Sequence, residues 1–147
     1  MLTNESLKAS GALRIVVTDK DGNIKEEREL TNLVVTVGKN FVASRVVGVA
    51  SNVMSHMAIG SGATAAAVGD TALQTELGRV PLGSGTATTN VVTYSATFPA
   101  GTGTGSITES GILNASSAGT LLCRTVFGVV TKSATDALSI NWNITIS

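Results

Sequence analysis

A single histidine, His56, is the most obvious candidate for catalytic chemistry in this chain. Together with a serine and one of the carboxylates Asp70, Glu76 or Glu109, it could form a Ser-His-acid arrangement in which the imidazole accepts the serine proton. The sequence contains no Gly-x-Ser-x-Gly elbow and no His-Glu-x-x-His pair, so no local motif supports this chemistry. We therefore interpret His56 as a strand or interface residue, and we expect a protein that is not an enzyme and has no catalytic residues.

The only cysteine, Cys123, excludes an intrachain disulfide and a metal site built from several cysteines. It follows two leucines, Leu121 and Leu122, and such an apolar run favours a buried, unreactive thiol. The alternative is a nucleophile, which would need His56 as its base.

Two short segments are similar to ligand-binding loops. Asp19 to Asn23 alternates oxygen ligands around a glycine, but a calcium loop of the EF-hand type needs glycine at its sixth position and glutamate at its twelfth. Gly101 to Gly105 could cradle a phosphate, but the residues that follow, 106–110, have the pattern of a strand rather than a helix. We predict a hairpin turn and an inter-strand loop, with no metal and no cofactor.

The charges are balanced in number but not in position. Ten basic and ten acidic residues cancel, and no stretch is strongly basic, so we expect no nucleic-acid binding. Thirteen of these twenty residues precede position 46 and seven follow it. The later part must therefore cover its surface with Thr, Ser, Asn, Gly and Ala, which lose little side-chain entropy when a partner covers them. Such a surface suits assembly, and it equally fits an ordinary Thr/Ser-rich β-domain.

The length of 147 residues fits one domain, 1–147. No apolar run approaches the roughly 20 residues that span a bilayer, so we expect no membrane segment. The first six residues lack the basic and apolar regions of a signal peptide, which predicts synthesis in the cytoplasm.

Alternating residues predict a hairpin near the start, with strands around 12–17 and 24–30 and its charged second strand at a sheet edge. A helix is expected from Thr36, acting as its cap, to a stop at Gly48. This charged hairpin and helix, 1–53, could form a docking element ahead of the body, 54–147.

The body is predicted to begin with a strand over 54–60, a small-residue loop over 61–69 and a helical turn from Asp70 through Gln74. Further strands are expected over 79–87, 90–98, 106–114, 120–130 and 136–146. The last is the clearest, because apolar residues occupy every second position from Leu138 to Ile146. The expected fold is mainly β: an antiparallel β-sandwich, jelly-roll or Greek-key-like, with an N-terminal hairpin and one short helix.

Several runs of the body resemble structural proteins of tailed bacteriophages. They are His-Met-Ala-Ile-Gly-Ser-Gly at 56–62, Thr-Ala-Leu-Gln-Thr-Glu at 71–76, Ile-Thr-Glu-Ser-Gly-Ile-Leu at 107–113 and Gly-Thr-Leu at 119–121. Domains that attach phage tail fibres use a similar succession. The resemblance covers residues 54–146 and implies a virion structural protein.

Among the structural proteins of such phages, the head decoration, or cement, proteins are similar to this chain in size and β-rich character. The resemblance implies contacts with the major capsid protein or tail proteins of the same virion, and a homo-oligomer, with a trimer as the expected form. A tail, baseplate or fibre-adaptor subunit is the alternative within the virion. A carbohydrate-binding module is the alternative outside it, although few aromatic residues are available and Trp142 shares the apolar face of its strand.

Overall fold

The computed structural model describes residues 4–147 of the chain. That part contains nine antiparallel strands and one helix. They are β1 (Ala9–Thr18), β2 (Ile24–Val34), α1 (Thr36–Val46), β3 (His56–Gly60), β4 (Glu76–Pro81), β5 (Ser84–Thr88), β6 (Val91–Phe98), β7 (Gly105–Leu113), β8 (Leu121–Lys132) and β9 (Ala137–Ile146). The predicted mainly-β fold with an N-terminal hairpin and one helix is confirmed.

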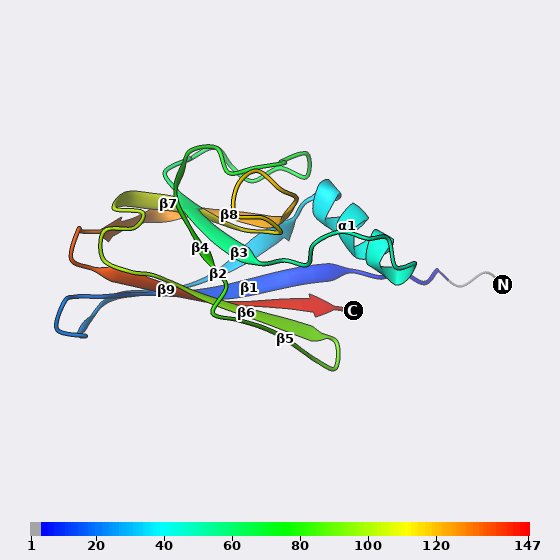
Figure 1. Ribbon diagram of the computed structural model, residues 1–147, viewed down its shortest axis with the longest axis horizontal. Coiled ribbons are helices and arrows are strands. Elements are labelled where there is room, and N and C mark those ends of the chain that lie inside the picture. Colours follow the sequence, from blue (N-terminus) through cyan, green and yellow to red (C-terminus); the bar gives the residue numbers. More distant parts are fainter. Residues whose placement is uncertain (1–3) are drawn as a thin grey trace.

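The strands form one curled sheet in the order β4-β3-β7-β8-β2-β1-β9-β6-β5. Its two edge strands, β4 and β5, are separated in sequence by Leu82 and Gly83 alone. Two edges that are joined by so short a connection must lie close together, so the sheet curls back on itself. Figure 1 shows the result: β3, β4, β7 and β8 lie over β1, β9, β6 and β5, in a sandwich-like half-barrel.

The core fills the space between the two halves. The alternation in β9 is confirmed, because Leu138, Ile140 and Trp142 are at most 1% exposed. Cys123, from the opposite half, is fully buried in the same cluster. Full burial of a large apolar side chain stabilises a fold by roughly 1.5–3 kcal/mol, so this cluster is the main source of stability.

Strand β2 joins the two halves. Its charged part pairs with β1 alone, up to Asn32, while only Leu33 and Val34 pair with β8. The predicted edge position of this strand is wrong, because β2 lies between β1 and β8 in the sheet. The charged stretch nevertheless has a ladder partner on one side only. The hairpin formed by β1 and β2 occupies the middle of the strand order.

Two sequence predictions for residues 70–88 are wrong. The expected strand over 79–87 is two strands, because Pro81 has no N–H to donate and the chain then crosses from one half of the sheet to the other. The expected helical turn from Asp70 to Gln74 does not form. The Asp70 carboxylate instead accepts hydrogen bonds from the Ala67 N–H and from Arg124.

Helix α1 occupies the predicted region, but Thr36 is not its cap. Val35 is the N-cap residue and supplies no side-chain hydrogen bond, while the Thr36 N–H donates to the Val68 carbonyl. Gly48 follows the helix with a φ of 70°, as a C-terminal stop requires. The helix packs against β8, with Gly38 at the contact. Among residues 4–147 there is no helix with the length and apolarity needed to cross a membrane.

Candidate functional site

Glu109 on β7 is a fully buried carboxylate that holds the loop over residues 61–75 in place. Its Oε1 accepts hydrogen bonds from the backbone N–H groups of Gly62 (2.9 Å) and Thr75 (2.7 Å), and its Oε2 accepts one from the Gln74 N–H (2.9 Å). Burial alone raises the pKa of this carboxyl, but the hydrogen bonds that it accepts lower the pKa by more. The group therefore stays ionised and fixes both ends of the loop.

Arg124 on β8 completes this buried cluster. Its Nε donates to Glu109 Oε2 at 2.9 Å, its Nη1 lies 2.8 Å from Asp70 Oδ2, and its Nη2 donates to the Thr64 carbonyl. Burial raises the pKa of Asp70, while hydrogen bonds from Ala67 and Arg124 lower it to a greater extent. The cluster ties β7 and β8 to the loop.

The remaining charged residues of the later part are also used inside the fold. Glu76 pairs with Arg79 at 2.7 Å, and Arg79 donates further hydrogen bonds to two carbonyls of the turn between β7 and β8. The buried Lys132 ammonium donates to the carbonyls of Pro99 and Asp136. The Asp136 carboxylate, in turn, lies 2.7 Å from Lys25 Nζ.

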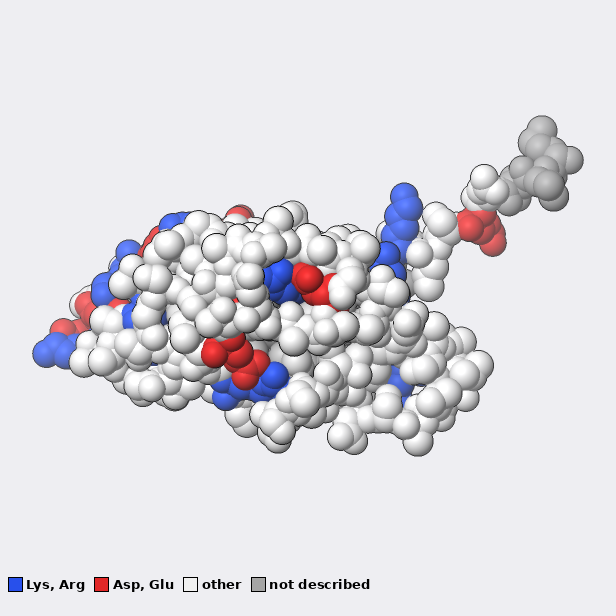
Figure 2. Space-filling model, turned by 90° about the horizontal axis from the view of Figure 1, so that it is seen from above, with Lys and Arg blue, Asp and Glu red and all other residues white. Residues whose placement is uncertain are grey.

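All seven charged residues after position 45 thus have a hydrogen-bonded partner within the fold. They are Asp70, Glu76, Arg79, Glu109, Arg124, Lys132 and Asp136. Figure 2 shows the outcome on one face, where charged atoms gather at the hairpin end and most of the remaining surface is uncharged. No charged side chain of residues 46–147 is therefore without a hydrogen-bonded partner in the fold.

The outer face of β5, β6 and β9 is a ladder of small polar side chains. Across it, Ser84 and Ser95 are linked at 2.6 Å and Thr97 and Ser139 at 3.0 Å. The Thr93 hydroxyl donates to the Asn143 side chain at 2.9 Å, and Thr86 lies opposite Thr93 in the register. The cross-strand hydrogen bonds hold these side chains in place, so a partner that covers the face orders few rotamers.

The two edges of the sheet differ in protection. β4 carries Pro81 and the Glu76–Arg79 ion pair, features that discourage pairing with another strand. β5, Ser-Gly-Thr-Ala-Thr, has neither proline nor charge, and all five of its residues are exposed. Within residues 4–147 it pairs with β6 alone. β5 is therefore the edge that is open to an added strand.

The structure does not bring His56 to its candidate carboxylates. His56 lies opposite Leu113, and Glu109 lies opposite Gly60, four residues or about 13 Å further along β3. Asp70 and Glu76 are paired with Arg124 and Arg79, as described above. His56 Nδ1 lies 2.8 Å from the neighbouring Ser55 hydroxyl, within a strand end.

The two loop candidates also have structural explanations. Asp19 Oδ1 accepts hydrogen bonds from the N–H groups of Asp21 and Asn23, which closes the predicted hairpin turn. Residues 99–104 form the predicted loop between β6 and β7. No cluster of three or more His, Cys, Asp or Glu side chains suited to a metal ion occurs in the part of the chain that the structure describes.

The aromatic side chains lie in or against the core. Trp142 and Phe98 are fully buried and Phe127 is 8% exposed, while Phe41 and Tyr94 pack against the same cluster. Sugars are commonly bound on exposed aromatic faces, whereas all five aromatic side chains of residues 4–147 are buried or partly buried.

Comparisons with known proteins name no relative: no protein-family model, curated protein or solved structure matches this chain.

The polar ladder and the buried cluster were only partly accessible from sequence. The shortage of charge after position 45 indicated the first. The buried cluster could have been inferred from Glu109 and Arg124, which are charged residues within the apolar segments 107–113 and 121–126.

Proposed function

We propose that this protein is a structural subunit of a bacteriophage particle, most simply a head decoration protein that stabilises the capsid by protein–protein contacts. The observation that carries the proposal is the internal use of all seven charged residues after position 45. The part of the surface that residues 46–147 form has no unpaired charged side chain, so it loses little hydration energy when it is covered, whereas protein surfaces generally carry many charges.

The polar ladder and the open β5 edge would provide the contacts. The hydroxyl and amide groups of the ladder can exchange their hydrogen bonds with water for hydrogen bonds with a partner. A strand of the major capsid protein could add to β5 through backbone hydrogen bonds, as in other cases of strand addition. The virion assignment itself rests on the resemblance of residues 54–146 to phage structural proteins.

The direct test is mass spectrometry of density-purified particles of the phage that encodes the chain. A copy number comparable to that of the major capsid protein supports the head role. A few copies per particle would replace it by the tail, baseplate or fibre-adaptor role. Complete absence from the particles would overturn the proposal of a virion protein.

A pair of substitutions tests the surface. Thr86→Lys places a charge on β5 beside the polar ladder, and Thr71→Lys places the same charge on an exposed loop of the opposite half. We expect Thr86→Lys to reduce incorporation into particles at least about tenfold, equivalent to roughly 1.4 kcal/mol, and Thr71→Lys to leave it unchanged. Equal incorporation of both variants would exclude the β5 surface as the contact.

A further inference from the structure

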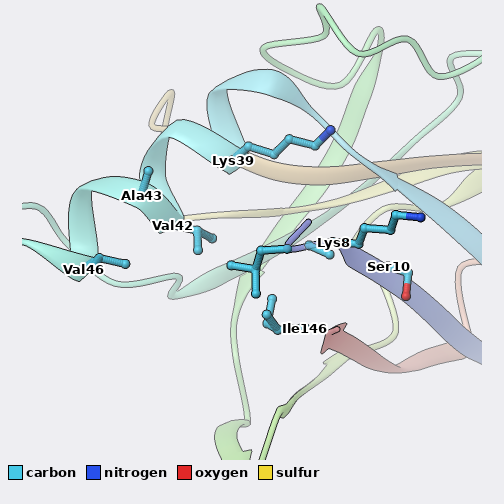
Figure 3. Close-up of a pocket in the computed structure, with 9 residues that line it drawn as sticks. Lys8, Ser10, Lys39, Val42, Ala43, Val46 and Ile146 are labelled. Atoms are coloured by element: carbon cyan, nitrogen blue, oxygen red, sulfur yellow. The ribbon is translucent and has the colours of Figure 1, made fainter. Parts of the chain in front are cut away.

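An apolar groove of about 630 Å³ lies between α1 and the ends of β1 and β9. Val42 of the helix and Ile146 of β9 lie on opposite sides of it, and Leu7, just ahead of β1, also lines it. In Figure 3 the side chains of Lys8 and Lys39 extend toward the same side of the groove. The groove is at the opposite end of the molecule from the charged hairpin turn (Figure 1).

Exposed apolar side chains lie in this groove and continue past it. Leu7 and Val46, which line the groove, are 78% and 81% exposed, and Val47 and Val49, which do not line it, are 78% and 50% exposed. Val49 lies against the last turn of α1, because its N–H donates to the Ser44 carbonyl. We call these four apolar residues the α1 patch. Exposed apolar surface of this kind marks a contact site, and a small ligand held in the groove would leave Val47 and Val49 uncovered.

Three basic residues accompany the α1 patch. Lys8 and Lys39 line the groove, and Arg45 lies in the last turn of α1. None of the three has an ion-pair partner within the described residues, 4–147. Glu5 is the only acidic residue in the segments that build this end, which are 4–9, 36–53 and 144–147. A neutral cover would take these cations out of water without a counter-ion, which is costly. Whatever covers the α1 patch must therefore be acidic as well as apolar.

We propose that the α1 patch and its groove bind an acidic, apolar segment of another protein of the same particle. Apolar side chains of that segment pack against Val46 and Ile146, and its carboxylates pair with Lys8 and Lys39. The inference rests on the proposed virion role and adds to it a second contact, apart from β5, with the chemistry of the partner stated.

Two other occupants match the α1 patch less well. A second copy of this chain has few carboxylates to offer, because six of its ten are already ion-paired within its own fold. Membrane surfaces are commonly contacted through exposed aromatic side chains, whereas the aromatic residues of 4–147 are buried or partly buried. A concave groove also suits a protein segment better than it suits a lipid surface.

Photo-cross-linking in purified particles tests this contact. The photoreactive residue p-benzoylphenylalanine replaces Val46 in one variant and Lys20, which is exposed in the hairpin turn at the other end, in a control variant. After irradiation and digestion, mass spectrometry identifies the linked segment. We expect position 46 to link to a segment of another virion protein with Asp or Glu among apolar residues. Position 20 should not link to that segment.

Charge reversal in the otherwise natural chain gives a second measurement. Lys39→Glu should lower incorporation into particles about two- to fivefold, the range for an exposed ion pair. Lys20→Glu makes the same change of charge at the other end of the molecule and should leave incorporation unchanged. A lysine in place of the carboxylate identified in the partner segment should restore the incorporation of the Lys39→Glu variant.

Several results would overturn the inference. They are a link from position 46 to a second copy or to a segment without acidic residues, and equal incorporation of Lys39→Glu and Lys20→Glu. Co-sedimentation of the purified protein with phosphatidylglycerol vesicles, abolished by Lys39→Glu, would assign the α1 patch to a membrane instead.

Failure of this inference is distinguishable from failure of the virion role. Absence of the chain from purified particles overturns both. If the chain is present but Lys39→Glu and Lys20→Glu are incorporated equally, only the contact at the α1 patch is overturned and the virion role stands.

Discussion

At the scale of single residues, Glu109 determines the conformation of the longest loop of the body. Each of its oxygens faces two N–H donors: Gly62 and Thr75 at Oε1, and Gln74 and Arg124 at Oε2. A carboxylate is the only side chain of this shape that accepts at both oxygens. The loop has few apolar side chains of its own, so these hydrogen bonds replace a local core.

Glu109→Gln should therefore destabilise the protein strongly. Whichever way the amide is turned, its NH₂ group faces two N–H donors, and Arg124 loses its buried counter-ion. We expect a loss of about 3–5 kcal/mol in the free energy of unfolding. Urea unfolding followed by the fluorescence of Trp142, the only tryptophan, measures it. Glu27→Gln, which removes an exposed partner of Arg14, should change the stability by less than about 1 kcal/mol. Similar losses in both variants would contradict the role of Glu109.

Acid should destabilise the fold below about pH 4. The hydrogen bond from Lys25, together with those from Ser133, lowers the pKa of Asp136 to about 2, and the pKa values of Asp70 and Glu109 are also lowered. A carboxyl group whose pKa is lower in the folded than in the unfolded chain stabilises the fold. This stabilisation is complete above the unfolded-state pKa, near 4, and is lost as the pH falls through the folded-state pKa. The urea midpoint should thus be steady from pH 7 to about 5 and fall between about pH 4 and 2.

The Asp136→Asn variant is the control for this pH dependence. This variant lacks one of the carboxyl groups whose pKa is lowered. Its urea midpoint should therefore be lower at neutral pH and should fall less steeply in acid. A variant with the same acid profile as the natural protein would show that Asp136 does not contribute.

At the scale of elements, α1 depends on close contact with β8. Gly38, in the first turn and a half of the helix, is buried, and a Cβ atom there would overlap the backbone carbonyl of Leu122. The helix also has no side-chain N-cap and contains several valines, which are poor helix formers. Packing, rather than propensity, must therefore keep it in place.

Gly38→Ala should displace α1 from the sheet even though alanine is the better helix former. We expect a loss of about 1–3 kcal/mol, the usual range for overpacking, together with weaker protection of the helix amides in hydrogen exchange. The matched control is Gly69→Ala, because a Cβ atom at that position meets nothing within 4 Å and its φ is not positive. If Gly38→Ala were as stable as Gly69→Ala, the proposed close contact would be wrong.

At the scale of the whole molecule, the curled sheet depends on β9. This strand lies between β1 and β6 and pairs with both along most of its length. Its apolar face carries Leu138, Ile140, Trp142 and Ile144 into the core. Without β9, strands β5 and β6 would have no ladder hydrogen bonds to the hairpin formed by β1 and β2.

Truncation after Asp136 should therefore leave an unfolded chain. Circular dichroism should show no cooperative thermal transition for this variant, since the loss of four large buried side chains alone removes about 6–12 kcal/mol. Removal of the first six residues leaves all of the strands β1 to β9 intact and is expected to keep the transition. A folded truncation would mean that the two halves of the sheet are separately stable.

The sequence alone determined the local features of this protein. Strand positions follow from a two-residue period, as in Leu138 to Ile146, and the turn at Asp19 to Asn23 and the stop at Gly48 follow from local backbone chemistry. The tertiary structure decided which strands are neighbours and where each charge is placed. Contacts such as Lys25 with Asp136, 111 residues apart, leave no periodic signal in either segment. For the same physical reason, the break between β4 and β5, the burial of Glu109 with Arg124 and the groove beside α1 appear only once the sheet has curled.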